Sequence, residues 1–201
     1  MDYRQFLQYV NELNNAQPII LMVGKRKVRI SDEASLVRIA SRLASDLPHC
    51  LFRSGNAGGA DTLFTEGVLA TAPERMQLVL PYSSHKKGSR NSQSSYYALE
   101  PAQLAEDDPV VYKTKELHPD SPRMIPGYLA GEKNRLTAKA PYLLRDTLMV
   151  LGDQSLGLAP ASVAIYYDDL RKPMQGGTGL TIRLCRQQGI LVKNQLAWMK
   201  W

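Results

Sequence analysis

Three glycines and one carboxylate are concentrated in the stretch FRSGNAGGAD, which runs from Phe52 to Asp61. Glycine allows positive φ angles and lets a ligand approach the backbone amides without a Cβ in the way. The apolar residues that follow recur with helical spacing, so the glycines are expected at a helix N-terminus, where free N–H groups and the helix dipole favour an anion such as phosphate. The stretch matches neither a Walker loop nor G-x-G-x-x-G, so a tight turn that binds nothing is an equal alternative. The candidate ligand-binding residues of this stretch are Ser54, Gly55, Asn56, Ala57, Gly58, Gly59, Ala60 and Asp61.

Two other turns have the same setting, after an apolar run and before a helical pattern. The turn GGTG at 176–179 follows the run SVAIYY, and its backbone N–H groups and threonine hydroxyl are expected to point at one spot. The turn GKR at 24–26 follows the run PIILMV, and a basic surface turn is its alternative reading. These turns add the candidate binding residues Gly24, Lys25, Arg26, Gly176, Gly177, Thr178 and Gly179.

The elements that must position these turns alternate along the chain. Short apolar runs at 18–23, 50–53, 78–80, 162–167 and 189–193 predict buried strands, and amphipathic helices are predicted between them. This order favours right-handed parallel βαβ units. We therefore predict an α/β fold, a Rossmann-like three-layer sandwich with a mostly parallel central sheet, in one nucleotide-binding domain over residues 1–201 with a lid-like insertion at about 82–140.

The predicted insertion combines positive charge with aromatic residues. His85, Lys86, Lys87 and Arg90 precede Tyr96 and Tyr97, a pattern that can contact nucleic acid or cover a bound nucleotide, although a solvated basic loop is the simpler reading. We also predict a further strand at 110–113.

The composition limits the class of protein. The chain has 201 residues, 44% of them hydrophobic, which suits one large domain with a real core. Cys50 and Cys185 have no paired metal or disulfide spacing and predict buried thiols, and we identify no metal site. The N-terminus lacks the apolar core of a signal peptide, so we expect a soluble, cytoplasmic protein without a membrane partner. The net charge of +6 favours anionic partners, either nucleotides or nucleic acid.

The turns GKR and RSGNAGGAD, the arginine in LLRDTLMVLG and the segment GGTGLTIRLCRQQGILV together resemble the SLOG superfamily. These Rossmann-like domains are related to DNA-processing protein A and to the Lonely-guy enzymes. The arrangement is similar to that of SLOG proteins found in phages and mobile elements.

The resemblance implies a nucleotide or nucleotide-derived ligand, such as an ADP-ribose-like or cyclic nucleotide-like molecule, with its phosphates on the glycine turns. By position, it also places Arg145 at the ligand. Asp61 would cap its own helix or accept a ribose hydroxyl. Two departures matter: Asp146 stands where the related pattern has asparagine, and the glutamate that follows the GGT turn in Lonely-guy enzymes is absent here.

The sequence therefore favours a sensor or sequestering module, with no certain cofactor beyond the nucleotide-derived ligand itself. Catalysis is left open. One alternative is a nucleotide hydrolase of the phosphoribohydrolase or N-glycosidase type, with Asp61 or Asp146 as acid or base and Arg145 steadying the anion. The second alternative is a DNA-binding protein like DNA-processing protein A. A homo-oligomer is compatible with all three.

Overall fold

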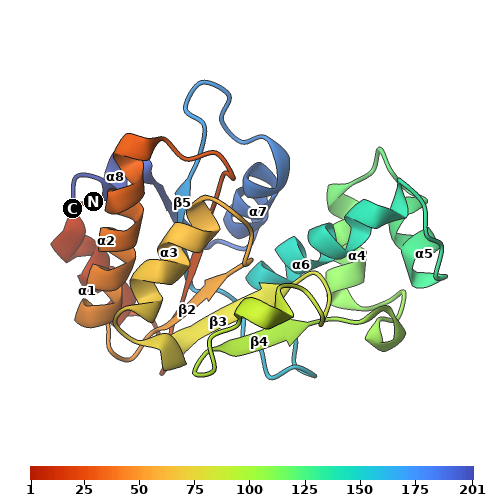
Figure 1. Ribbon diagram of the computed structural model, residues 1–201, viewed down its shortest axis with the longest axis horizontal. Helices are drawn as coiled ribbons and strands as arrows, with labels where there is room; N and C mark the ends of the chain where they lie inside the picture. The colour runs from red at the N-terminus through yellow and green to blue at the C-terminus, as the bar shows by residue number, and fades with distance from the viewer.

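The computed structural model describes residues 1–201 and shows a single six-stranded sheet between two layers of helices (Figure 1). The strands are β1 (Ile19–Gly24), β2 (Leu51–Ser54), β3 (Met76–Leu80), β4 (Ser95–Ala98), β5 (Val163–Tyr167) and β6 (Leu191–Asn194). The helices are α1 (Tyr3–Asn11), α2 (Ile30–Asp46), α3 (Ala60–Leu69), α4 (Pro109–Leu117), α5 (Met124–Leu129), α6 (Ala140–Leu151), α7 (Gly176–Gln187) and α8 (Gln195–Trp198).

The strands lie in the order β4-β3-β2-β1-β5-β6, and every neighbouring pair is parallel. The predicted Rossmann-like α/β fold is thereby confirmed, and the sheet is wholly rather than mostly parallel. The order reverses at β1, which pairs with β2 on one side and with β5 on the other. In such sheets the connections on the two sides lead to opposite faces, which opens a crevice at the carboxyl ends of the two strands.

Burial explains why the strands are short apolar runs. The side chains of β1 alternate between the two faces of the sheet: Ile20 and Met22 join the core under α2 and α3, while Leu21 and Val23 join the core under α6 and α7. All four are buried. A parallel strand that is covered on both faces has no polar side, and this is the pattern that the sequence carries.

Residues 82–140 are built into one end of the sheet. They contribute β4 as an edge strand beside β3, and α4 and α5 beside α6. The strand predicted at 110–113 is wrong, because these residues lie within α4. Asp108 accepts hydrogen bonds from the N–H groups of Val110 and Val111 and so caps this helix, and Pro109 occupies its first turn. That this segment is an insertion stays a prediction.

The two tyrosines of this segment lie in β4 and alternate across the sheet. Tyr96 packs against the core under α2 and α3, and Tyr97 packs against the core on the other face. The guanidinium of Arg90 lies 4.9 Å from the centre of the Tyr96 ring. The pair therefore contributes to the sheet rather than forming a joint stacking surface.

None of the helices combines the length and apolar character that crossing a bilayer requires.

Candidate functional site

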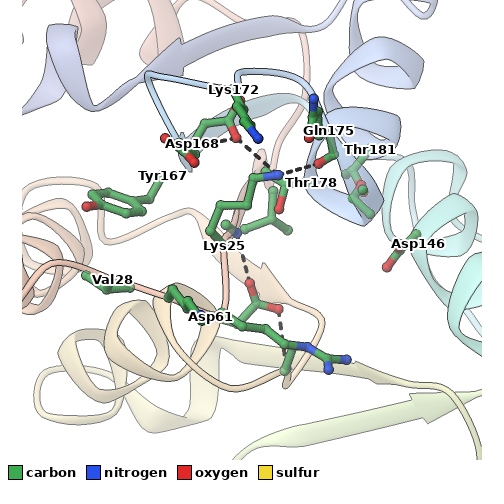
Figure 2. Close-up of a pocket in the computed structure, with 18 of the residues that line it drawn as sticks. Lys25, Val28, Asp61, Asp146, Tyr167, Asp168, Lys172, Gln175, Thr178 and Thr181 are labelled. Carbon is green, nitrogen blue, oxygen red and sulfur yellow. Dashed lines mark hydrogen bonds and ion pairs between the residues drawn. The ribbon is translucent and has the colours of Figure 1, made fainter.

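A cleft of about 1240 Å³ opens at the carboxyl ends of β1 and β5. Its walls come from the loops after these two strands, from the N-terminal turn of α7 and from α6 (Figure 2). The position is the one expected from the topology, because β1 and β5 flank the point at which the strand order reverses. Within the segment 82–140, only Ala138 and Lys139, which lie just before α6, line the cleft.

The cleft gathers part of each predicted turn. The predicted residues that line it are Gly24, Lys25, Arg26, Ala57, Asp61, Arg145, Asp146, Gly176, Gly177 and Thr178. The predicted residues that lie outside its lining are Ser54, Gly55, Asn56, Gly58, Gly59, Ala60 and Gly179. Three segments that are far apart in the sequence thus meet at one edge of the sheet, but the first glycine turn contributes less of its length than the sequence suggested.

The N-terminus of α3 is covered by the loop after β1. The Ala60 N–H donates to the carbonyl oxygen of Lys25 at 3.0 Å. Gly59 has a φ of +77°, and a Cβ at this position would lie 2.6 Å from the Cα of Arg26. Gly59 therefore permits a close crossing of two backbone segments, which glycine alone tolerates. The protein itself occupies part of the space that a phosphate would need.

The side chain of Asp61 contacts the backbone of both segments at this crossing. Its Oδ1 accepts from the Gly24 N–H at 2.9 Å, and its Oδ2 accepts from the Ala57 N–H at 3.3 Å. The side chain therefore joins the end of β1 to the glycine turn, and it does not cap the N–H groups of its own helix. Burial raises the pKa of Asp61 to about 6, although the nearby Arg145 guanidinium and the two N–H groups favour the ionised form.

Arg145 reaches the same turn from the other side of the sheet. It projects from α6, is 8% exposed, and donates from Nη1 to the carbonyl oxygen of Gly55. Its Nε lies 2.8 Å from Oδ1 of Asp146, the next residue of the helix. Burial raises the pKa of Asp146, and the Arg145 charge opposes that shift. Arg145 is thus held between a backbone carbonyl and a carboxylate.

The N-terminus of α7 is open to the cleft. It has no side-chain cap, and the N–H groups of Gly176, Gly177 and Thr178 donate to no acceptor in the protein. Gly176 has a φ of +64°, which brings the chain into the helix from the loop after β5. Unpaired N–H groups at the positive end of a helix dipole suit an anion or another acceptor. Of the two predicted glycine turns, the second therefore provides the accessible backbone.

Two aspartates, the buried Asp168 and the half-buried Asp32, hold the loops around this opening. Asp168, at the end of β5, accepts from the Met174 N–H at 2.7 Å and lies 3.5 Å from Lys25 Nζ, which also donates to the carbonyl of Gln175. On the opposite side, the Tyr167 hydroxyl donates to Asp32 at 2.7 Å. The contacts of Lys25 with Asp168 and Gln175 connect the loops after β1 and β5 (Figure 2).

The positive charges of the cleft are mostly unpaired. Among the lysines and arginines that line it, Lys25 and Arg145 lie within 4.0 Å of a carboxylate. The others have no carboxylate within that distance and make no side-chain hydrogen bond: Arg26, Lys27, Arg29, Lys139, Arg171 and Lys172. Eight lysines and arginines line the cleft against five aspartates, namely Asp32, Asp61, Asp146, Asp168 and Asp169, so positive charge is in excess. The cleft can therefore attract an anion with several charges.

Several lining residues were not among the candidates taken from the sequence. The missed cations Lys27 and Arg29 belong to the run KRKVR, of which only the first part was used, and Asp168 to Lys172 directly follow β5. The rule that ligands bind beyond the carboxyl ends of parallel strands would have found both groups. No group of three or more His, Cys, Asp or Glu side chains is placed to hold a metal ion.

The basic segment after β3 borders the first glycine turn. Lys86 Nζ donates to the carbonyl oxygen of Asn56 at 2.8 Å, and Arg90 donates to the carbonyl of His85 at 3.0 Å. Neither Lys86 nor Arg90 lines the cleft. This segment is therefore partly tied to the body of the protein by its own charged side chains.

The fold and the cleft define a Rossmann-like α/β protein with a basic crevice at the switch point of its sheet. No protein-family model matches the chain, and no match is found among curated proteins. Among solved structures, the chain is similar to DNA processing protein A from Helicobacter pylori, a structure described for its single-stranded DNA binding mode. The similarity covers 96% of this chain and 68% of that chain, with 14% identity and a TM-score of 0.48, and it concerns the fold alone.

Proposed function

We propose that the cleft binds a nucleotide or nucleotide-derived molecule, of the ADP-ribose or cyclic nucleotide kind, and that the protein acts as a sensor or sequestering module for it. The observation that carries this proposal is the set of six unpaired cations that line the same cleft as the open N-terminus of α7. Phosphate groups are the common biological anions that engage cationic side chains, and the helix N-terminal N–H groups offer donors to a further acceptor of the same ligand. The SLOG resemblance of the turns, including its mobile-element form, agrees with this ligand class.

Apolar side chains at one end of the cleft support a ligand with a ring system. Leu170, Leu196 and Met199 line the cleft and are 40%, 58% and 40% exposed. Leu196 and Met199 are three positions apart at the chain's last helical turn, and Gln195 joins this turn to Asp168 through a hydrogen bond to the Asp168 N–H at 3.1 Å. An apolar surface next to cations suits a nucleobase attached to phosphates better than inorganic phosphate.

A binding role is favoured over catalysis by the state of the carboxylates. Asp61, one of the candidate acids, has both oxygens engaged by backbone N–H groups. Asp146 is then the remaining candidate that lines the cleft with a free oxygen. The two candidate acids therefore leave one free carboxylate, which by itself does not supply the pair of groups that general acid and base catalysis of hydrolysis uses.

The direct test is isothermal titration of the purified protein with AMP, ADP-ribose, a cyclic adenine nucleotide and NAD, with mass spectrometry of the ligand after each titration. We expect at least one of these compounds to bind and to be recovered intact. No binding by any of them at millimolar concentration would refute the proposal. Recovery of a cleaved product would establish the hydrolase alternative instead.

Charge reversal at the cleft is the first variant test. Lys172→Glu and Arg26→Glu should each lower the affinity for the bound nucleotide by about tenfold or more, since each replaces an attractive charge by a repulsive one near a phosphate. Arg4→Glu is the matched control, because Arg4 lies exposed on α1 outside the cleft lining. Equal losses in all three variants would mean that the net charge, not the cleft, binds the ligand.

Nucleic acid binding is tested in the same preparation. If the cations serve a DNA strand, a retardation gel should show binding that weakens steeply as the salt concentration rises, and mononucleotides should compete poorly. If they serve a small nucleotide, a short oligonucleotide should bind weakly and be displaced by the ligand. The two results are mutually exclusive, so one gel series with competitor separates the two partners.

A further inference from the structure

One carboxylate oxygen of the cleft has no partner within the protein. Asp146 is 6% exposed and lies between α6 and the N-terminal turn of α7 (Figure 2). Its Oδ1 is 2.8 Å from Arg145 Nε, and its Oδ2 accepts no hydrogen bond from the protein. A Cβ built on Gly177 would lie 2.8 Å from Oδ2. The free oxygen is therefore directed at the start of α7.

The groups beside this oxygen have the opposite hydrogen-bonding character. The N–H groups of Gly177 and Thr178 are donors without acceptors, and no bond from either of them to Asp146 is formed. The positive charges of Arg145, Arg26 and His118 each lower the pKa of the Asp146 carboxyl group, against the effect of burial. A ligand atom at this point therefore meets two kinds of unsatisfied group at once: N–H donors on α7 and a carboxylate acceptor on α6.

A sugar hydroxyl satisfies both kinds of group, and a phosphate does not. A hydroxyl donates one hydrogen bond through its O–H and accepts others through its lone pairs. A fully ionised phosphate only accepts, and it would be repelled by an ionised carboxylate in a poorly hydrated site. The phosphates are better served by the unpaired cations of the loops after β1 and β5, namely Arg26, Lys27, Arg29, Arg171 and Lys172.

We propose that Asp146 Oδ2 accepts a hydrogen bond from a ribose hydroxyl whose oxygen also contacts the N-terminus of α7, so that the cleft selects ribonucleotides over deoxynucleotides. This assignment rests on the nucleotide-binding function proposed above. It makes Asp146 a specificity-determining residue, and it gives the second glycine turn a sugar rather than a phosphate as its ligand group. Gly177 is then required because a Cβ there would lie 2.8 Å from Oδ2, the atom that accepts the hydrogen bond.

The test compares AMP with 2′-deoxy-AMP and 3′-deoxy-AMP by isothermal titration on the wild-type protein and on Asp146→Asn. If ADP-ribose binds and AMP does not, ADP-ribose and its deoxyribose analogues take their place. The wild type should prefer the ribonucleotide over at least one deoxy analogue by about tenfold, because hydrogen bonds to a charged group are among the strong ones. Asp146→Asn should reduce this preference to within about threefold. Asp107→Asn, a charge-matched change at an exposed residue outside the cleft, should retain it.

Each ratio is measured on a single variant, so a general loss of folding or affinity does not mimic the expected result. Equal affinities of the wild type for ribo- and deoxynucleotides would overturn the assignment while leaving nucleotide binding intact. If Asp146→Asn raised the affinity for all ligands by the same factor, the assignment would also be overturned, because the carboxylate would then face a phosphate. If no nucleotide binds at all, the proposed function fails first, and this inference fails with it.

Discussion

At the scale of single residues, the glycine turn from Phe52 to Asp61 has a different role from the one that its composition first suggests. Asp61 bonds to the backbone of Gly24 and Ala57, and Gly59 lets the loop after β1 cross the start of α3. The turn therefore joins β1, β2 and α3 into a rigid floor. The residues with unsatisfied groups toward the cleft are those of the loops after β1 and β5, of α7 and of α6, where Asp146 lies.

The stability of the protein should depend on pH through Asp61. Burial raises its pKa to about 6, so the folded state holds this proton more tightly than the unfolded chain does. The stabilisation is complete below about pH 4 and is lost as the pH rises through about 6. The loss should amount to ~3 kcal/mol at most. The variant Asp61→Asn should be less stable than the wild type overall, but its stability should not show this loss.

The measurement is urea denaturation of both proteins from pH 4 to pH 7.5. Histidines and Asp146 contribute to the slope of each profile, but the difference between the profiles isolates Asp61. That difference should shrink as the pH rises. Parallel profiles would mean that the pKa of Asp61 is the same in the folded and unfolded states.

At the scale of elements, the helices α2 and α3 pack closely against each other. A Cβ on Gly67 of α3 would lie 2.8 Å from the Cβ of Ala40 and would clash with the carbonyl of Val37 on α2. The two helices therefore pack at a distance that only glycine permits. Since Asp32 of α2 and Asp61 of α3 line the cleft, this contact also affects the spacing of these two residues.

Gly67→Ala should destabilise the fold by about 1–3 kcal/mol, because the added methyl group must push the two helices apart. Gly58→Ala is the matched control, since a Cβ at Gly58 meets nothing within 4 Å and its φ is not positive. The control should change stability by less than about 0.5 kcal/mol. Thermal and urea denaturation measure both, and a silent Gly67→Ala would show that the helices can separate without cost.

At the scale of the whole molecule, the two cores share one sheet. Each central strand gives alternate side chains to both faces, so neither helical layer can leave without exposing the strands of the other. The two chain ends also lie side by side (Figure 1). The rings of Phe6 and Trp201 are 4.6 Å apart. This arrangement favours the predicted single domain over residues 1–201 and a cooperative unfolding transition.

The two cysteines provide a test of that cooperativity. Cys50 lies in the core under α2 and α3, and Cys185 lies in the core on the other face. Burial raises the pKa of Cys50 to about 11 and that of Cys185 to about 12, so both thiols should resist alkylation in the native protein. Pulsed labelling across a urea titration, read by peptide mass spectrometry, should give the same midpoint for both. Separate midpoints would indicate that the two layers unfold independently.

The order of strands and helices could be predicted from the sequence because their signals are local. A continuous apolar run marks a strand buried on both faces, and a helical stripe marks each helix packed on them. The two failures were also local. The short strand β4 (Ser95–Ala98) lies at the sheet edge in a polar segment that carries no strand signal. The helix at 109–117 begins with two valines, which favour a strand, although Asp108 and Pro109 are helix start signals.

The sequence by itself determined the α/β class, the three turns at the ends of strands and the excess of positive charge, because each follows from neighbouring residue types. Only the tertiary structure decided which turn is open. Lys25 and Arg26 cross the start of α3 and cover it, whereas the start of α7 faces the cleft and Asp146. That outcome depends on contacts between segments far apart in the chain, and no local pattern encodes how two backbones pass each other.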